Sequence, residues 1–455
     1  MGGSDAGKTA SLTLLLLLIG TAPFLAAAQA PASIAFSLPG NALLLFFAFL
    51  TAALTFLFDS SPISVRAIGL PLGTTAALAL FAGAQLLPFP EGFLRAVASA
   101  NVTIYHEAIE TLRAFGAKTV PSARVTIAPT ETADALLLII AAAAVFFCSA
   151  TLLATRANRR VFTAVLLASA ALQSLWLFRG PALRSKASTP VAPESLAAFL
   201  EIALATAFGV LWAEVLTGRD RSGDAVERSE RLERRLPALV ARALVWALFA
   251  AAIVRTEWRA SLLSAAATTI LVAAAGVLRL LTRNARRAAR IAGLSFVIGC
   301  VALAVWGGAL DRRLGGPAAS HRAALRQASV GAWRQFPLVG SGLGAYREAF
   351  RRVQSEAIRE RVDRGPDDLR SLAVTGGLVG VCLAATLFLS LPLLSLERWS
   401  RQRHREESAF ALGGFGALAS LILHGLIGSG FSSPAVVLTL AGVQGAAWAA
   451  GAKIK

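Results

Sequence analysis

The sequence predicts an all-α protein that crosses a membrane many times. The chain of 455 residues is 56% hydrophobic and only 15% charged, a composition that ordinary soluble domains do not have. Long apolar runs recur along its whole length, and several exceed the roughly 18–20 residues that cross a bilayer. Because a backbone in lipid must satisfy its own hydrogen bonds, these runs are expected to be helices.

About twelve runs are long and apolar enough to cross a bilayer. The first ends in a sequence similar to a signal-peptidase site, but a second run follows directly, so we expect it to be retained as a helix. A helical outer loop is expected between the ninth and tenth spans. The expected spans are residues 10–29, 39–58, 67–88, 133–154, 161–178, 196–216, 238–254, 260–280, 291–310, 372–396, 409–426 and 434–451.

The formal net charge of +18 is concentrated between the apolar runs. If the N-terminus is cytoplasmic, every well-populated short basic loop falls on the cytoplasmic side, as the positive-inside rule requires. Both termini are then cytoplasmic, and anionic lipid headgroups, not nucleic acid, are the expected partners of this charge. The short loops on this side are residues 59–66, 155–160, 217–237, 281–290 and 397–408.

Two longer loops fall on the outer side, one in each half of the chain. We expect an N-terminal transmembrane half over residues 1–237 with outer loop 89–132, and a C-terminal half over residues 238–455 with outer loop 311–371. Within the first loop, Glu91 to Gly116 has helical spacing of apolar residues, which predicts an amphipathic helix on the outer surface. It is either a membrane-surface helix or a packing lid over the bundle.

The second outer loop is rich in arginine and is expected to form helix, glycine turn, helix and re-entry into the membrane. One helix covers Arg322 to Trp333, and a charged helix covers Tyr346 to Arg364. Asp367 and Asp368 are expected to cap the next membrane helix. The turn between the two helices contains Pro337, Gly340, Gly342 and Gly344.

The glycines of this turn permit positive φ and a close approach of the backbone. Beside several arginines, such a turn is compatible with binding a phosphate through N–H groups and guanidinium groups. The alternative is a tight turn between two surface helices. No Gly-Lys-Ser/Thr follows, so the turn is not a nucleotide-binding P-loop.

Three segments together resemble the O-antigen ligase and polymerase family of bacterial membrane glycosyltransferases. The first is Arg322-x-x-Leu325 followed by Trp333-Arg-Gln-Phe-Pro337-Leu-Val-Gly340-Ser-Gly342-Leu-Gly344-Ala-Tyr346. The second is Arg255-Thr-Glu-Trp-Arg259-Ala-Ser-Leu-Leu, at the outer start of a span. The third is His424-Gly-Leu-Ile-Gly-Ser-Gly-Phe431-Ser-Ser-Pro434-Ala435. The resemblance covers about residues 240–450, while the first half agrees only in hydropathy.

The resemblance implies glycosyl transfer at the periplasmic face of the bacterial inner membrane. The donor is an undecaprenyl-pyrophosphate-linked glycan, and the acceptor is the lipid A core of lipopolysaccharide or a growing polysaccharide. Arg259 and Arg322 would hold the pyrophosphate and stabilise the charge that grows on it. No cofactor or metal is implied, because the lipid pyrophosphate is already an activated leaving group.

The chain departs from the family at three positions. The family has His-Asn-Asp after its charged loop helix and a Glu soon afterwards, whereas this chain has Gly365, Pro366 and Val374 at these places. Asp367 or Asp368 is then the remaining carboxylate that could position or deprotonate the acceptor.

The residues without a clear family role leave alternatives open. His321, His424 and Arg255 are further candidates for the outer site, while His424 could instead form a helix-packing hydrogen bond and Arg255 and Arg259 could be interfacial anchors. Glu201 is an acid inside a span, and such groups are functional candidates by default. The alternatives to transfer are a non-catalytic descendant that binds lipid-linked glycan and a lipid-linked sugar translocator or transporter.

Overall fold

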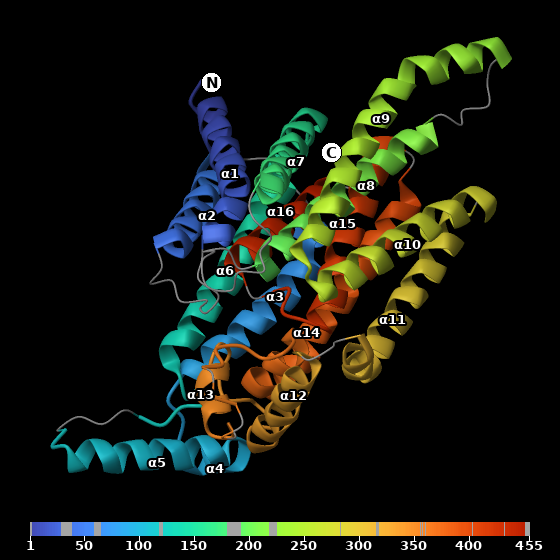
Figure 1. The fold of residues 1–455 in the computed structure, drawn as a ribbon. Coiled ribbons are helices and arrows are strands. Elements are labelled where there is room, and N and C mark those ends of the chain that lie inside the picture. The colour runs from blue at the N-terminus through green and yellow to red at the C-terminus, as the bar shows by residue number, and fades with distance from the viewer. Residues whose placement is uncertain are drawn as a thin grey trace.

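The protein is an elongated bundle of helices in a computed structural model (Figure 1). Apart from one isolated bridge between Pro88 and Arg124, the described residues contain no β-structure. The structure describes residues 2–28, 39–58, 65–117, 122–179, 193–217, 225–282, 284–314, 318–354, 356, 358–359, 361–402, 404–431 and 433–450.

Within these residues, ten helices are long and apolar enough to cross a membrane, and two shorter apolar helices join them. The all-α polytopic fold is therefore confirmed, and every expected span falls on a helix. These helices are α1 (Gly2–Ala28), α2 (Pro39–Phe58), α3 (Val65–Leu86), α6 (Pro129–Leu152), α7 (Arg156–Arg179), α8 (Pro193–Thr217), α9 (Ala225–Thr256), α10 (Arg259–Thr282), α11 (Ala285–Leu314), α14 (Asp368–Arg401), α15 (Arg405–Gly425) and α16 (Pro434–Ala449).

The centre of the bundle is the pair α8 and α15. In their apolar windows 78% and 89% of the residues are buried, compared with 17–56% in the other candidate spans. Small residues allow the two backbones to meet, because a Cβ added at Gly209 would lie 2.8 Å from Gly413 Cα. Helix α16 packs on α6, and α14 packs on α15 and α3. Helices from the two expected halves therefore interleave.

Four further helices lie at one end of the bundle: α4 (Glu91–Val97), α5 (Ser99–Ala114), α12 (Ala318–Gln335) and α13 (Tyr346–Arg351). The first residues of α1 and the last residues of α16 lie at the opposite end (Figure 1). Helices α4 and α5 run across the bundle, as the amphipathic pattern predicts, with a break at Ala98. Asn101 and Tyr105 fasten α5 by donating to the carbonyls of Val125 and Thr126.

The expected charged helix from Tyr346 to Arg364 is wrong beyond its first turns. Helix α13 ends at Arg351, and the chain then continues without helical structure among the described residues. Directly after the end of α13, Arg352 pairs with another element and lies 3.0 Å from Glu107 of α5. This tertiary contact competes with the helical propensity of the segment.

Candidate functional site

A buried histidine–glutamate pair joins the two central helices. His424 Nδ1 of α15 lies 2.7 Å from Glu201 Oε1 of α8, and both side chains are 0% exposed. The other carboxylate oxygen of Glu201 accepts from Ser264 Oγ at 2.8 Å and from Ser420 Oγ at 2.6 Å. A buried carboxylate is costly unless it is paired and hydrogen-bonded, and here every partner is supplied by the helices packed around it.

A second carboxylate lies on the other side of the imidazole. Glu194 is about two turns before Glu201 on the same face of α8. Its Oε1 accepts from Ser429 N and Ser429 Oγ, both at 2.7 Å, and lies 3.9 Å from His424 Nε2. Among the described residues His424 Nε2 is a buried atom with no hydrogen-bond partner, and Glu194 is the carboxylate that faces it.

Asp368 brings a third carboxylate to the same place from the outer loop. Its Oδ2 accepts from Phe431 N at 3.0 Å, and its own N–H donates to Gly428 O at 3.0 Å. A Cβ at Gly425 would lie 2.7 Å from Asp368 Oδ2, so the glycine makes room for the carboxylate. The opposing charge is Arg364. Burial lowers the pKa of its guanidinium group, and the nearby carboxylates of Glu194, Asp368 and Asp363 partly offset this effect.

Both carboxylate oxygens of Asp367 are engaged in contacts within the protein. As the N-cap of α14 it accepts from Arg370 N at 2.9 Å, which confirms the expected cap. Its other oxygen contacts the Arg370 guanidinium and lies 3.6 Å from Arg326 Nε. The pKa of this carboxyl is raised by burial, and the two arginines offset only part of that rise. With both oxygens engaged, Asp367 is a weaker candidate for a base than Asp368.

The glycine turn is inserted into a kink of α14. Gly377 interrupts that helix with φ 59° and ψ −162°. Leu378 N and Val379 N donate to Pro337 O and Leu338 O of the turn, at 2.8 and 3.1 Å. In return, Ser341 N and Gly342 N each donate at 3.0 Å, to the carbonyls of Val374 and Thr375 respectively. The turn and the broken helix therefore exchange the hydrogen bonds that a regular helix would make internally.

This exchange explains the three glycines in the turn. Gly340, Gly342 and Gly344 have φ of 75°, 111° and 88°. Leu343 N donates to Gln85 Oε1 of α3 at 2.9 Å, so this amide is also used within the protein. The interpretation of the turn as a cradle of free N–H groups for phosphate is thus not supported, and the tight-turn alternative fits the contacts.

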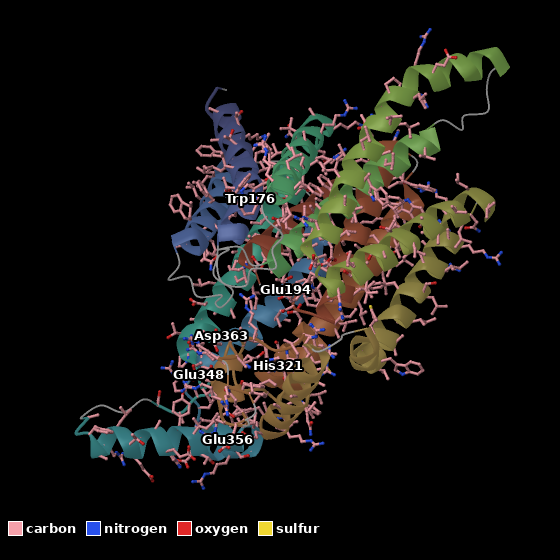
Figure 2. All side chains as sticks on the ribbon, in the orientation of Figure 1. Trp176, Glu194, His321, Glu348, Glu356 and Asp363 are labelled. Atoms are coloured by element: carbon pink, nitrogen blue, oxygen red, sulfur yellow. The ribbon has the colours of Figure 1, made fainter. Side chains whose placement is uncertain are left out.

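The other predicted residues lie on α9, α10 and α12. Arg259 is the first residue of α10 and is exposed, and two residues later Ser261 Oγ lies 3.3 Å from His424 Nδ1. Arg255 is in the last turn of α9. His321 is exposed on α12, displaced from Glu194 toward the outer-loop end (Figure 2). Arg322 is half-buried one turn before Arg326, which reaches Asp367.

The cluster therefore joins segments that are remote in sequence: the start of α10, the start of α14, the α15–α16 turn and the N-terminal half of α8. Sequence reasoning missed Glu194 and Arg364. Glu194 could have been found, because it lies seven residues before the intramembrane acid Glu201 and shares its helix face. Arg364 gave no such signal among the many arginines of its loop.

An apolar cavity of about 230 Å³ adjoins this polar cluster. Helices α3, α6, α14, α15 and α16 enclose it with side chains that include Leu72, Leu138, Phe388 and Phe431. Phe431 lines the cavity while its backbone N–H holds Asp368, and its ring lies 4.7 Å from that of Phe388. A single molecule with an apolar tail and a polar head would fit this combination.

Fold and site define a multi-pass all-α membrane protein with a buried acid–histidine cluster near one end of its bundle. No protein-family model and no curated protein sequence matches the chain.

Proposed function

We propose that the protein transfers a glycan from an undecaprenyl-pyrophosphate carrier to a lipid or polysaccharide acceptor at the outer face of a bacterial inner membrane. One observation carries the proposal: the three segments that resemble the O-antigen ligase family approach one another around His424 and Asp368. Ser261 lies beside His424, Gly428 accepts from the Asp368 N–H, and the loop that contains Arg322 is joined to the same end through Arg326 and Asp367.

The adjoining cavity supports an amphiphilic substrate. A polyprenyl tail would lie along the apolar walls near Phe388 and Phe431, and the pyrophosphate would lie at the rim. Arg259 and Arg322 are assigned to the pyrophosphate, because guanidinium groups make bidentate contacts with phosphate oxygens. These cations would stabilise the charge that grows as the bond from the sugar C1 to the pyrophosphate breaks.

The proton of the acceptor hydroxyl is assigned to the Glu194–His424 pair. As the hydroxyl oxygen bonds to the sugar C1, its proton passes to this pair and undecaprenyl pyrophosphate leaves. Glu201 acts as a positioning residue, because it holds His424 Nδ1 and leaves Nε2 directed at Glu194. The family's outer loop supplies a histidine that this chain lacks there. In this proposal His424 of α15 supplies the imidazole, and Asp367 is not needed as a base.

Arg259→Ala and Arg322→Ala should each weaken binding of a polyprenyl-pyrophosphate analogue by about 10- to 100-fold, the effect of losing one charge-assisted hydrogen bond. Microscale thermophoresis on the purified full chain measures this. Arg334→Ala is the matched control, because it removes an exposed arginine from the last turn of α12. Binding that is unchanged in both test variants would reduce Arg259 and Arg322 to interfacial anchors.

The orientation of the chain is part of the proposal. The basic loops favour cytoplasmic termini, with α4, α5, α12 and α13 outside. A cysteine at Glu356 should react with a membrane-impermeant maleimide in intact cells, and one at Asn284 only after permeabilisation. Both positions are exposed, and the native exposed Cys382 is replaced by serine in both variants. The reverse labelling pattern would place the cluster at the cytoplasmic side and exclude periplasmic transfer.

Translocation is the second candidate, and the Glu201–His424 pair favours it. Ionisable pairs inside membrane helices often form proton relays in transporters. A translocator would move a fluorescent polyprenyl-linked sugar across proteoliposomes in response to a pH gradient without forming a new glycosidic bond. A new bond formed in the absence of any gradient supports transfer instead.

A further inference from the structure

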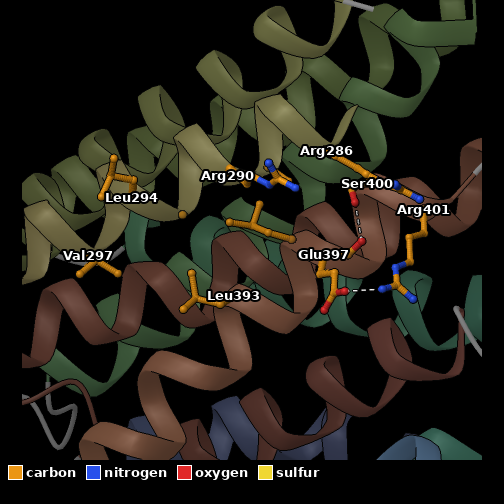
Figure 3. Close-up of a pocket in the computed structure, with 11 residues that line it drawn as sticks. Arg286, Arg290, Leu294, Val297, Leu393, Glu397, Ser400 and Arg401 are labelled. Carbon is orange, nitrogen blue, oxygen red and sulfur yellow. Dashed lines mark hydrogen bonds and ion pairs between the residues drawn. The ribbon is translucent and has the colours of Figure 1, made fainter. Parts of the chain in front are cut away.

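A lateral groove lies between α11 and α14 (Figure 3), toward the end of the bundle opposite to α4, α5, α12 and α13 (Figure 1). Its volume is about 670 Å³, and its floor includes Leu294, Val297, Leu393 and Leu396. Gly293 of α11 lets Leu393 of α14 approach at the floor, because a Cβ added there would lie 2.9 Å from Leu393 Cδ2. The groove is separate from the buried cluster and from the apolar cavity beside it.

The rim of the groove is basic. Arg286 and Arg290 are exposed and lie one turn apart on α11, and Arg401 and Glu397 come from α14. Glu397 is already paired with Arg401 (Figure 3). Among the described residues no acid pairs with Arg286 or Arg290, so the rim presents two cations whose charge is not neutralised.

We infer that this groove binds an anionic phospholipid, with its phosphate on Arg286 and Arg290 and an acyl chain along Leu294, Val297 and Leu393. Both α11 and α14 are candidate membrane spans, so hydrocarbon is what meets a lateral groove between them. From Arg290 to Val297 the helix rises about 10 Å, which places the apolar floor at acyl-chain depth below a phosphate at the rim.

Charge complementarity selects the headgroup. Cations near the end of a membrane helix attract the anionic lipids of the adjacent leaflet, and guanidinium groups donate to phosphate oxygens. A zwitterionic lipid offers the same phosphate but adds an ammonium group that the arginines would repel. The groove should therefore prefer phosphatidylglycerol to phosphatidylcholine.

Native mass spectrometry of the full chain released from nanodiscs that contain equal amounts of the two lipids tests this inference. The wild type should retain phosphatidylglycerol preferentially. An Arg286→Ala/Arg290→Ala variant should lose that preference by about 25-fold, or about fivefold for each arginine. Arg287→Ala is the matched control, because this arginine is exposed on the same helix but does not line the groove.

A second variant tests the apolar part. Gly293→Leu pushes a side chain against Leu393 at the floor of the groove and should reduce the number of retained lipids whatever their headgroup, while the thermal unfolding temperature reports on folding. Equal retention of both lipids by the wild type would overturn the inference. An Arg287→Ala variant that loses as much preference as the double variant would also overturn it, because the effect would then belong to the general surface charge.

Discussion

A Gly340→Ala variant should be less stable than the wild type by about 2–5 kcal/mol. Left-handed φ costs a residue with a Cβ about 1–2 kcal/mol, and overpacking adds about 1–3 kcal/mol. Both terms apply here, because Gly340 has φ 75° and its added Cβ would lie 2.2 Å from Thr375 O. The variant should separate the turn from the α14 kink. Unfolding of the detergent-solubilised chain by denaturant measures the difference.

Two further variants sharpen this test. Gly377→Ala approaches the same contact from the other side, since its Cβ would lie 2.4 Å from Leu338 O at φ 59°, and it should be similarly destabilising. Gly331→Ala is the control: it lies within α12 with nothing within 4 Å of an added Cβ, so it should be neutral or up to about 1 kcal/mol more stable. Unchanged stability in Gly340→Ala and Gly377→Ala would mean that the turn does not depend on its kinked partner.

The glycine turn also shows where sequence reasoning stops. The run from Pro337 to Gly344 predicts a turn with positive φ, which the structure has. Its partner is an interrupted stretch of α14 more than thirty residues later, together with Gln85 on α3. No local pattern encodes such a pairing, so the free amides needed for phosphate binding were inferred from a turn in which the amides of Ser341, Gly342 and Leu343 are already bonded.

The membrane helices were predictable because lipid imposes a single rule on long apolar runs. The outer segments were harder, because tertiary contacts decide them. Ala98 breaks the expected surface helix, and the ion pair of Arg352 with Glu107 lies where the helix was expected to continue after Arg351. The prediction that Asp367 caps α14 is correct, because capping depends on the adjacent residues alone.

The candidate site was only partly predictable. His424, Asp368 and Glu201 were recognisable as polar residues at the borders or within spans, and the structure brings them together with Glu194. Which of them meet depends on how α8 rotates against α15, and the sequence of one helix does not fix that rotation. Assigning Asp367 as a base failed to anticipate its pairing with Arg326, which comes from a separate helix.

His424→Gln should lower glycan transfer by about 10²–10⁴-fold, the usual contribution of a positioned proton-transfer group. Glutamine keeps a hydrogen-bonding side chain near Glu201 but cannot exchange a proton at Nε2. Glu194→Gln should have an effect of the same order, because it removes the carboxylate that faces Nε2 at 3.9 Å. His321→Gln is the control, because that histidine is exposed on α12. Binding of the polyprenyl-pyrophosphate analogue should change little in the His424 variant.

The most direct measurement is transfer by the purified chain in proteoliposomes, with an undecaprenyl-pyrophosphate-linked glycan as donor and lipid A core or polysaccharide as acceptor. We expect a new glycosidic bond with the wild type and with His321→Gln, and a loss of at least about 100-fold with His424→Gln and Glu194→Gln. Wild-type protein that binds the donor without transferring it would make the chain a lipid-linked glycan binder. Robust transfer that is indifferent to His424 and Glu194 would contradict the assignment of the buried cluster as the site.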